Sequence, residues 1–169
     1  AYDATSHLIK LGSEKIALLS TIQNLSVGKL RLDGYKKALS DANLSIDENL
    51  IILETSIEDF DLKLQDLISS KKMDAVFALD EHSSTITMRM ALKQGIKIPE
   101  ELNIIGFADG VWSRRLTPSL STVSQHAPEI GAKAAELLIH KLNSKDEFYQ
   151  PQTVVIKTEL RQRESTRKL

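Results

Sequence analysis

Three side chains in this sequence have the chemistry to contact a small polar ligand: Arg31, Asp80 and Trp112. Arginine presents a planar fork of N–H donors that fits a carboxylate, a phosphate or a pair of neighbouring hydroxyls. An aspartate accepts hydrogen bonds, and a tryptophan ring can stack on a ligand. Each residue also has a plainer interpretation, as a solvated arginine, a helix-capping aspartate and a tryptophan that fills a gap. The spacing of the three residues leaves both interpretations open.

Patterns for catalysis, metal binding and cofactor binding are missing from the sequence. The chain has no cysteine, which excludes a disulfide framework, a thiolate metal site and a cysteine nucleophile. Its histidines are not paired at metal-ligand spacing, and no GxSxG, phosphate-loop or dinucleotide-binding motif occurs. A phosphate-accepting role for Asp80 would require an acidic pair after the first strand, where residues 20–23 read Ser-Thr-Ile-Gln. We therefore expect no enzymatic activity, no metal and no cofactor.

The composition is that of one ordinary globular domain. The chain has 169 residues, of which 41% are hydrophobic, and 22 basic residues balance 23 acidic ones. A domain that binds nucleic acid by its own field is normally basic, so a net charge of −1 argues against that function. No apolar run approaches the roughly 18 residues that span a bilayer. Because the first residue is Ala1 and structure begins at once, we expect the chain to be a piece of a longer protein.

The residues with ligand chemistry are spaced along an alternation of strands and helices. Short apolar runs at residues 16–19, 50–53, 75–79 and 102–106 predict buried strands, with helical patterns between them. This alternation predicts an α/β fold with a parallel sheet. Ligands in such sheets bind outside the carboxyl ends of the strands, which is where Asp80 and Trp112 fall. Arg31 lies on the helix after the first strand, near the same edge.

The pattern changes after Gly106. Residues 107–118 read as an irregular connection, residues 120–123 as a short strand and residues 128–142 as a helix. Residues 153–160 alternate in polarity, which is typical of a strand at the edge of a sheet. The basic residues from position 161 onward are expected to fray.

Several phrases together resemble one family. Arg31 begins R-x-x-G-Y, and residues 95–107 contain G-x-x-I-P-E-E-L followed by I-G-F. Residues 118–125 read P-S-L-S-T-V-S-Q, and residues 160–165 read L-x-x-R-x-S. The first helix and the start of the first strand, over residues 7–17, also match this family, as does the helix over residues 131–142. In this order they resemble the effector-binding domain of the lactose-repressor/galactose-repressor family of bacterial transcriptional regulators.

The resemblance implies a doubly wound, mostly parallel α/β sheet of the periplasmic-binding-protein-like type. Such a sensor has two subdomains with the ligand between them. Residues 1–117 and 151–165 would form the C-terminal subdomain, and residues 166–169 a tail. Residues 120–147 would return to an N-terminal subdomain that is otherwise absent from this chain.

The resemblance also implies a ligand-binding set. Arg31 falls on the family's ligand-binding arginine and Gln125 on the glutamine of the crossing strand. Asp80 falls on the aspartate of the family's Asn-Asp pair, whereas Leu79 replaces the asparagine.

A further ligand-binding position differs from the family pattern. Ala108 stands where an aspartate is common, and Asp109 follows it, so Asp109 is expected to turn toward the ligand instead. The expected ligand-binding set is Arg31, Asp80, Asp109, Trp112 and Gln125.

The resemblance predicts a cytoplasmic sensor of a sugar-like effector that controls DNA binding allosterically. The partners it implies are the effector, a second copy of the protein in a homodimer, and operator DNA through a head domain absent from this chain. No contact with a membrane is expected. The alternatives are a periplasmic-type solute receptor that serves a membrane transporter and an enzyme built on a doubly wound sheet.

Overall fold

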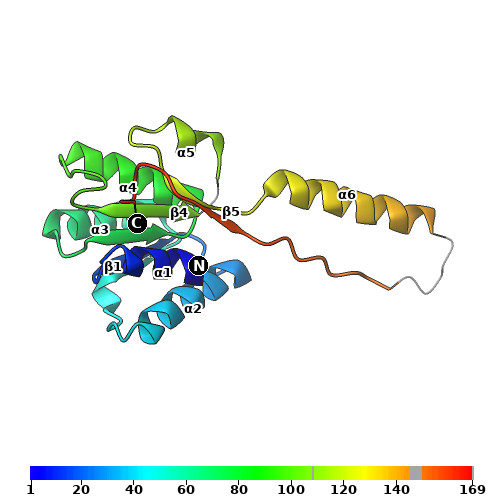
Figure 1. Ribbon diagram of the computed structural model, residues 1–169, viewed down its shortest axis with the longest axis horizontal. Coiled ribbons are helices and arrows are strands. Elements are labelled where there is room, and N and C mark those ends of the chain that lie inside the picture. The colour runs from blue at the N-terminus through cyan, green and yellow to red at the C-terminus, as the bar shows by residue number, and fades with distance from the viewer. Residues whose placement is uncertain (108, 145–149, 169) are drawn as a thin grey trace.

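In the part of the chain that the structure describes, a six-stranded sheet forms the body, in the strand order β2-β1-β3-β4-β5-β6 (Figure 1). The structure is a computed structural model that describes residues 1–107, 109–144 and 150–168. Strands β1 to β5 run parallel, and β6 pairs antiparallel with β5. The strands are β1 (Ile16–Ser20), β2 (Ile51–Leu53), β3 (Ala75–Ala78), β4 (Asn103–Phe107), β5 (Ser121–Ser124) and β6 (Glu159–Arg161).

Helices cover both faces of the sheet. Successive side chains of a strand point to opposite faces, so Ile16 and Leu18 of β1 pack in the core with α1 and α2, whereas Ala17 and Leu19 pack in the core with α3 and α4. The strands are therefore apolar throughout, and the predicted doubly wound, mostly parallel α/β fold is confirmed. The helical elements are α1 (Tyr2–Lys10), α2 (Ser26–Asp41), η1 (Glu48–Leu50), α3 (Ile57–Ser70), α4 (Glu81–Lys93), α5 (Val111–Arg115) and α6 (Ala127–Asn143).

The chain reverses direction across the sheet between β1 and β3. From β1 it crosses through α2 to β2 on one side, and from β3 it crosses through α4 to β4 on the other. The carboxyl ends of β1 and β3 therefore lie at the edge where such sheets bind ligands. The first residue after β1, Thr21, donates its backbone N–H to Asp80 Oδ2 at 2.8 Å, which joins the two strand ends.

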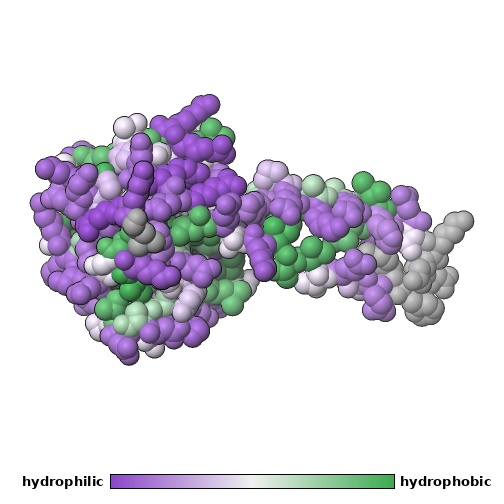
Figure 2. All heavy atoms as spheres, in the orientation of Figure 1, coloured by the Kyte–Doolittle hydropathy of each residue, from purple (hydrophilic) through white to green (hydrophobic). Residues whose placement is uncertain are grey.

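One part of the chain projects from the body (Figure 1). We call α6 together with residues 150–158 the arm. None of the residues of α6 is buried, and its apolar side chains Ile130, Leu138 and Leu142 are exposed. Figure 2 shows apolar surface along the arm. Among the described residues, no helix has both the length and the apolar character needed to cross a membrane.

The connections to the arm differ from the sequence prediction at two places. Strand β5, which falls inside the segment expected to return to another subdomain (residues 120–147), pairs with β4 and β6 in the body; residues 145–147 of that segment lie outside the described residues. The strand expected over residues 153–160 is limited to Glu159–Arg161. Residues 153–158 run beside α6 and pair with no other described strand, so their alternating pattern does not form a strand.

The tail does not fray, contrary to the prediction. Ser165 is fully buried and donates its hydroxyl to the Ile104 carbonyl at 2.6 Å. Thr166 is also buried, and the Arg167 backbone N–H donates to Asn103 Oδ1 at 2.9 Å. These contacts close the end of β4 that lies opposite the ligand edge. Position 169 lies outside the described residues.

Candidate functional site

Arg31 is buried at the ligand edge of the sheet. Only 9% of the residue is exposed, because α2 packs along the sheet with this side chain turned inward. Its Nη1 donates to the Leu79 carbonyl at 2.5 Å, and its guanidinium lies over the ring of Phe107. The interpretation of Arg31 as a solvated surface residue is therefore wrong.

The charge of Arg31 is only partly compensated. Burial lowers the pKa of Arg31, and the charge of the nearby Asp80 opposes that shift. Among the described residues Arg31 has no ion pair within 4.0 Å, and its buried Nε has no hydrogen-bond partner. A buried donor without a partner costs about 1 to 3 kcal/mol. The contacts among the described residues therefore leave Arg31 with unused donor capacity at this edge of the sheet.

Asp80 caps a helix, as its plainer interpretation predicted. Its Oδ1 accepts from the Ser83 backbone N–H at 2.8 Å, and the Ser83 hydroxyl lies 3.3 Å from the Asp80 backbone N–H, which completes a capping box at the start of α4. Its Oδ2 accepts from the backbone N–H of Thr21. Because both oxygens bind backbone groups, Asp80 joins the end of β1 to the start of α4, and it also supplies negative charge near Arg31.

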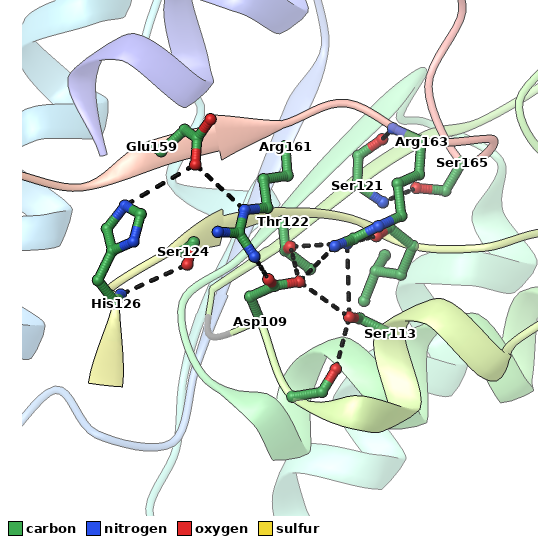
Figure 3. A network of polar contacts seen from close by, with 12 residues as sticks. Asp109, Ser113, Ser121, Thr122, Ser124, His126, Glu159, Arg161, Arg163 and Ser165 are labelled. Carbon is green, nitrogen blue, oxygen red and sulfur yellow. Dashed lines mark hydrogen bonds and ion pairs between the residues drawn. The ribbon is translucent and has the colours of Figure 1, made fainter. Parts of the chain in front are cut away.

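Asp109 lies at the centre of a polar network (Figure 3). Its carboxylate forms ion pairs with Arg161 and Arg163, and it accepts hydrogen bonds from Thr122 Oγ1 at 3.0 Å and Ser113 Oγ at 3.2 Å. The contacts come from β6 and the residues after it, from β5 and from α5. Only 4% of the Asp109 side chain is exposed. Asp109 therefore joins the elements around the last strands of the sheet.

The electrostatics of this network favour the charged form of Asp109. Burial alone would raise the pKa of this carboxyl. The hydrogen bonds from Arg163, Thr122 and Arg161, with the charge of Arg163, more than offset burial and lower the pKa of Asp109 to about 2. The carboxylate is consequently ionised throughout the neutral range and has most of its acceptor capacity in use.

A cavity of about 500 Å³ opens beside this network at the foot of the arm. Gln125 and Asp109 line it, together with Arg161 and with charged residues that the sequence analysis did not select. Those residues are Glu81, Arg114 and Glu129. The cavity therefore offers donors and acceptors in about equal measure.

The structure divides the expected ligand-binding set into three places. Arg31 and Asp80 lie near the carboxyl ends of β1 and β3, and Asp109 and Gln125 line the cavity at the foot of the arm. Trp112 lies on α5 with 64% of its surface exposed, outside the lining of that cavity. Ala108, the other position considered, lies outside the described residues.

Sequence reasoning missed the role of Arg161 and Arg163. The L-x-x-R-x-S phrase did contain a signal, because Arg163 and Ser165 are its two polar positions. Arg163 donates to Asp109 and to the Leu120 carbonyl. Arg161 falls between the fixed positions of the phrase, so no sequence signal indicated its contact with Asp109. Among the described residues, no group of three or more metal-ligating side chains is placed to hold an ion.

This geometry defines a ligand-binding α/β domain, with polar side chains at the switch point of a doubly wound sheet and an arm that leaves the sheet and returns to it. The family described as periplasmic binding protein-like domains matches residues 5–166. The chain belongs to this family, and within it to the effector-binding domains of LacI/GalR-type regulators.

Individual relatives support the assignment. The ribose operon repressor of Haemophilus influenzae is 34% identical over 88% of this chain and 46% of its own length. A protein of Sanguibacter keddieii assigned to the LacI family superposes with a TM-score of 0.87 at 27% identity, over 97% of this chain and 62% of its own. The transcriptional regulator CelR in complex with cellobiose gives a TM-score of 0.84 at 28% identity, over 95% and 49% of the two chains. These relatives are transcriptional regulators, which favours that interpretation over a transport receptor.

Proposed function

We propose that this chain is the greater part of an effector-sensing domain of a transcriptional regulator. The observation that carries the proposal is the buried, incompletely satisfied Arg31 at the switch point of a LacI/GalR-type effector domain. A guanidinium in this position can donate to the oxygens of a small polar ligand. The proposed role is sensing, with no catalytic step.

The proposed effector is a sugar or a related polyhydroxylated metabolite. The complex of the relative CelR with cellobiose supports this class. On this chain, Arg31 would supply donors, and Gln125 would supply both a donor and an acceptor. Leu79 offers no side-chain polar group at its position, so we expect fewer hydroxyl contacts from this strand than an asparagine would give.

The proposed division of the chain places the arm in a second subdomain. The chain spans about half the length of the curated relatives it matches, 46% of one and 49% of another. The exposed apolar side chains of α6 support the division, since several large apolar groups left in water cost about 1.5 to 3 kcal/mol each. In the proposed arrangement, the body and residues 159–168 form the C-terminal subdomain, and residues 125–158 complete the other.

The proposed mechanism is allosteric. An effector held between the two subdomains would stabilise one angle between them, and that angle would change the affinity of a separate head domain for operator DNA. We propose that the regulator acts in the cytoplasm as a homodimer. The net charge of −1 supports DNA contact through the head alone.

The test is titration calorimetry on the full-length regulator with a panel of monosaccharides and disaccharides, joined to an operator-binding assay. We expect one sugar to bind and to change operator affinity. In Arg31→Ala the binding should weaken by about 2 to 4 kcal/mol, whereas Arg115→Ala, which alters an exposed arginine on α5, should leave it unchanged. Full affinity in Arg31→Ala, or sugar binding without any effect on operator affinity, would contradict the proposal.

A further inference from the structure

The arm is joined to the body by two neighbouring segments. The chain leaves through Gln125 and His126 after β5, and it returns through Glu159, the first residue of β6. Strands β5 and β6 pair with each other at this point, with Ser124 opposite Glu159. Any rotation of the arm relative to the sheet must therefore be taken up at these residues.

A continuous set of charged contacts crosses this junction (Figure 3). Arg161 forms an ion pair with Asp109 in the body and donates its Nε to Glu159 Oε2 at 3.2 Å. The same Glu159 oxygen lies 3.8 Å from Nε2 of His126. Arg161 is thus the side chain that links the fixed carboxylate of Asp109 to the residues at which the arm begins and ends.

The backbone at the junction is in a rarely occupied conformation. His126 has φ 52° and ψ 47°, the left-handed region. A residue other than glycine in this region costs of order 1 to 3 kcal/mol and persists only where the surrounding contacts fix it. Because no residue of α6 is buried, packing of α6 does not fix this conformation within the part of the chain that the structure describes. Among the described residues, the junction contacts are therefore the main constraint on where the arm points.

We propose that Arg161 is a positioning residue that sets the orientation of the arm relative to the sheet. An arginine is charged at any physiological pH, and the hydrogen bonds with Glu159 and Asp109 raise the pKa of this guanidinium further. Arg161 keeps 36% of its side chain exposed and lines the cavity at the foot of the arm. The residue that orients the arm therefore also faces the space where an effector would enter. A link between the effector and the orientation of the arm rests on the proposed function, whereas the role of Arg161 in orienting the arm does not.

The experiment measures the orientation directly and needs no effector. Because the chain has no cysteine, Lys10→Cys on α1 and Ala135→Cys on α6 introduce a single pair of spin labels. Pulsed dipolar spectroscopy then gives the distribution of distances between body and arm. We expect Arg161→Leu to broaden or shift this distribution. The matched control Arg115→Leu, an exposed arginine of α5 outside the network, should leave it unchanged.

Further variants separate orientation from loss of stability. Glu159→Gln removes the charge of one partner of Arg161 and should broaden the distribution less than Arg161→Leu, with the body intact. Val76→Ala weakens the buried core and should lower the unfolding midpoint without broadening. In Arg161→Ala, free guanidinium added at a non-denaturing concentration should narrow the broadened distribution of spin-label distances again.

An unchanged distribution in folded Arg161→Leu, or equal broadening in Val76→Ala, would overturn the inference. If Arg161→Leu does not fold, Glu159→Gln decides in the same way, since an unchanged distribution there would also overturn it. The sensing function has its own readout in the sugar titration. A failed titration together with a broadened distribution would therefore leave the positioning role of Arg161 intact.

Discussion

The guanidinium carbon of Arg31 lies 3.5 Å from the centroid of the Phe107 ring. Phe107 is the last residue of β4 and Arg31 lies on α2, so the contact reaches across the ligand edge of the sheet. An aromatic face attracts a cation without forming hydrogen bonds with its N–H groups. The contact therefore holds the guanidinium in place and leaves donors for a ligand.

Arg31→Met should separate stability from ligand binding. It removes a buried, incompletely satisfied charge and also the hydrogen bond to Leu79, and these effects oppose each other. We expect the free energy of unfolding in urea to change by less than about 1 kcal/mol. Effector affinity should fall by about 2 to 4 kcal/mol.

Arg31→Lys is the matched comparison, because it keeps the charge and loses the planar guanidinium. It should be less stable than Arg31→Met, although it is the more conservative change. A loss of more than about 3 kcal/mol in Arg31→Met would show that Arg31 is primarily a structural residue.

Asp80→Ala should destabilise the chain by about 2 to 3 kcal/mol, because it removes the cap of α4 and leaves the Thr21 backbone N–H without its acceptor. Asp80→Ser can restore the cap but is too short to reach Thr21 as well, so it should recover about half of the loss. Urea unfolding followed by circular dichroism measures both. Equal stability of Asp80→Ala and the parent chain would contradict the double role of this carboxylate.

Asp109 should contribute stability that acid removes. Its pKa is lowered from 3.8 to about 2, so the contribution is complete above about pH 4 and is lost as the pH falls toward about 2. After allowance for screening by solvent, it amounts to about 1 to 2 kcal/mol. Asp109→Asn should be less stable at pH 7 and should show a flatter stability curve between pH 4 and 2. Asp33→Asn, at an exposed position on α2, is the control and should keep the slope of the parent chain.

Gly28→Ala should disturb the loop that follows β1. A Cβ at this position would lie 2.2 Å from the Ile22 carbonyl oxygen, and a backbone atom cannot move aside cheaply. We expect a loss of about 1 to 3 kcal/mol in unfolding free energy and weaker effector binding. Gly131→Ala in α6, where nothing lies within 4 Å of the added carbon, should leave stability unchanged or slightly raised. Equal effects of the two changes would show that the close approach at Gly28 is not what limits this position.

The sheet could be predicted from sequence because its strands are buried on both faces. A strand such as Ile16–Ser20 then appears as a short apolar run that no exposed element resembles. The cap at Asp80 was also predictable, since it needs only the residues that follow it in sequence. Residues 153–158 show the opposite case, because an alternating pattern forms a strand only where another strand is available to pair with it.

The site could be predicted only in part, because its geometry depends on residues far apart in sequence. The burial of Arg31 requires Leu79 and Phe107, and neither is close to it along the chain. Arg161 appears in the sequence as one of several basic residues near the end of the chain. Its role becomes visible only when the fold brings it to Asp109.

Residues 159–166 have a consequence for the synthesis of the protein. The body reaches β5 at Ser124, yet the Ile104 backbone N–H and the Ser121 backbone N–H are satisfied by the carbonyl and the hydroxyl of Ser165, at 2.8 Å each. A ribosome must therefore translate the whole arm before the backbone N–H groups of Ile104 and Ser121, which are translated earlier, find their partners. During that interval the nascent body has an open sheet edge at β5, and a chaperone that covers strand edges would protect it.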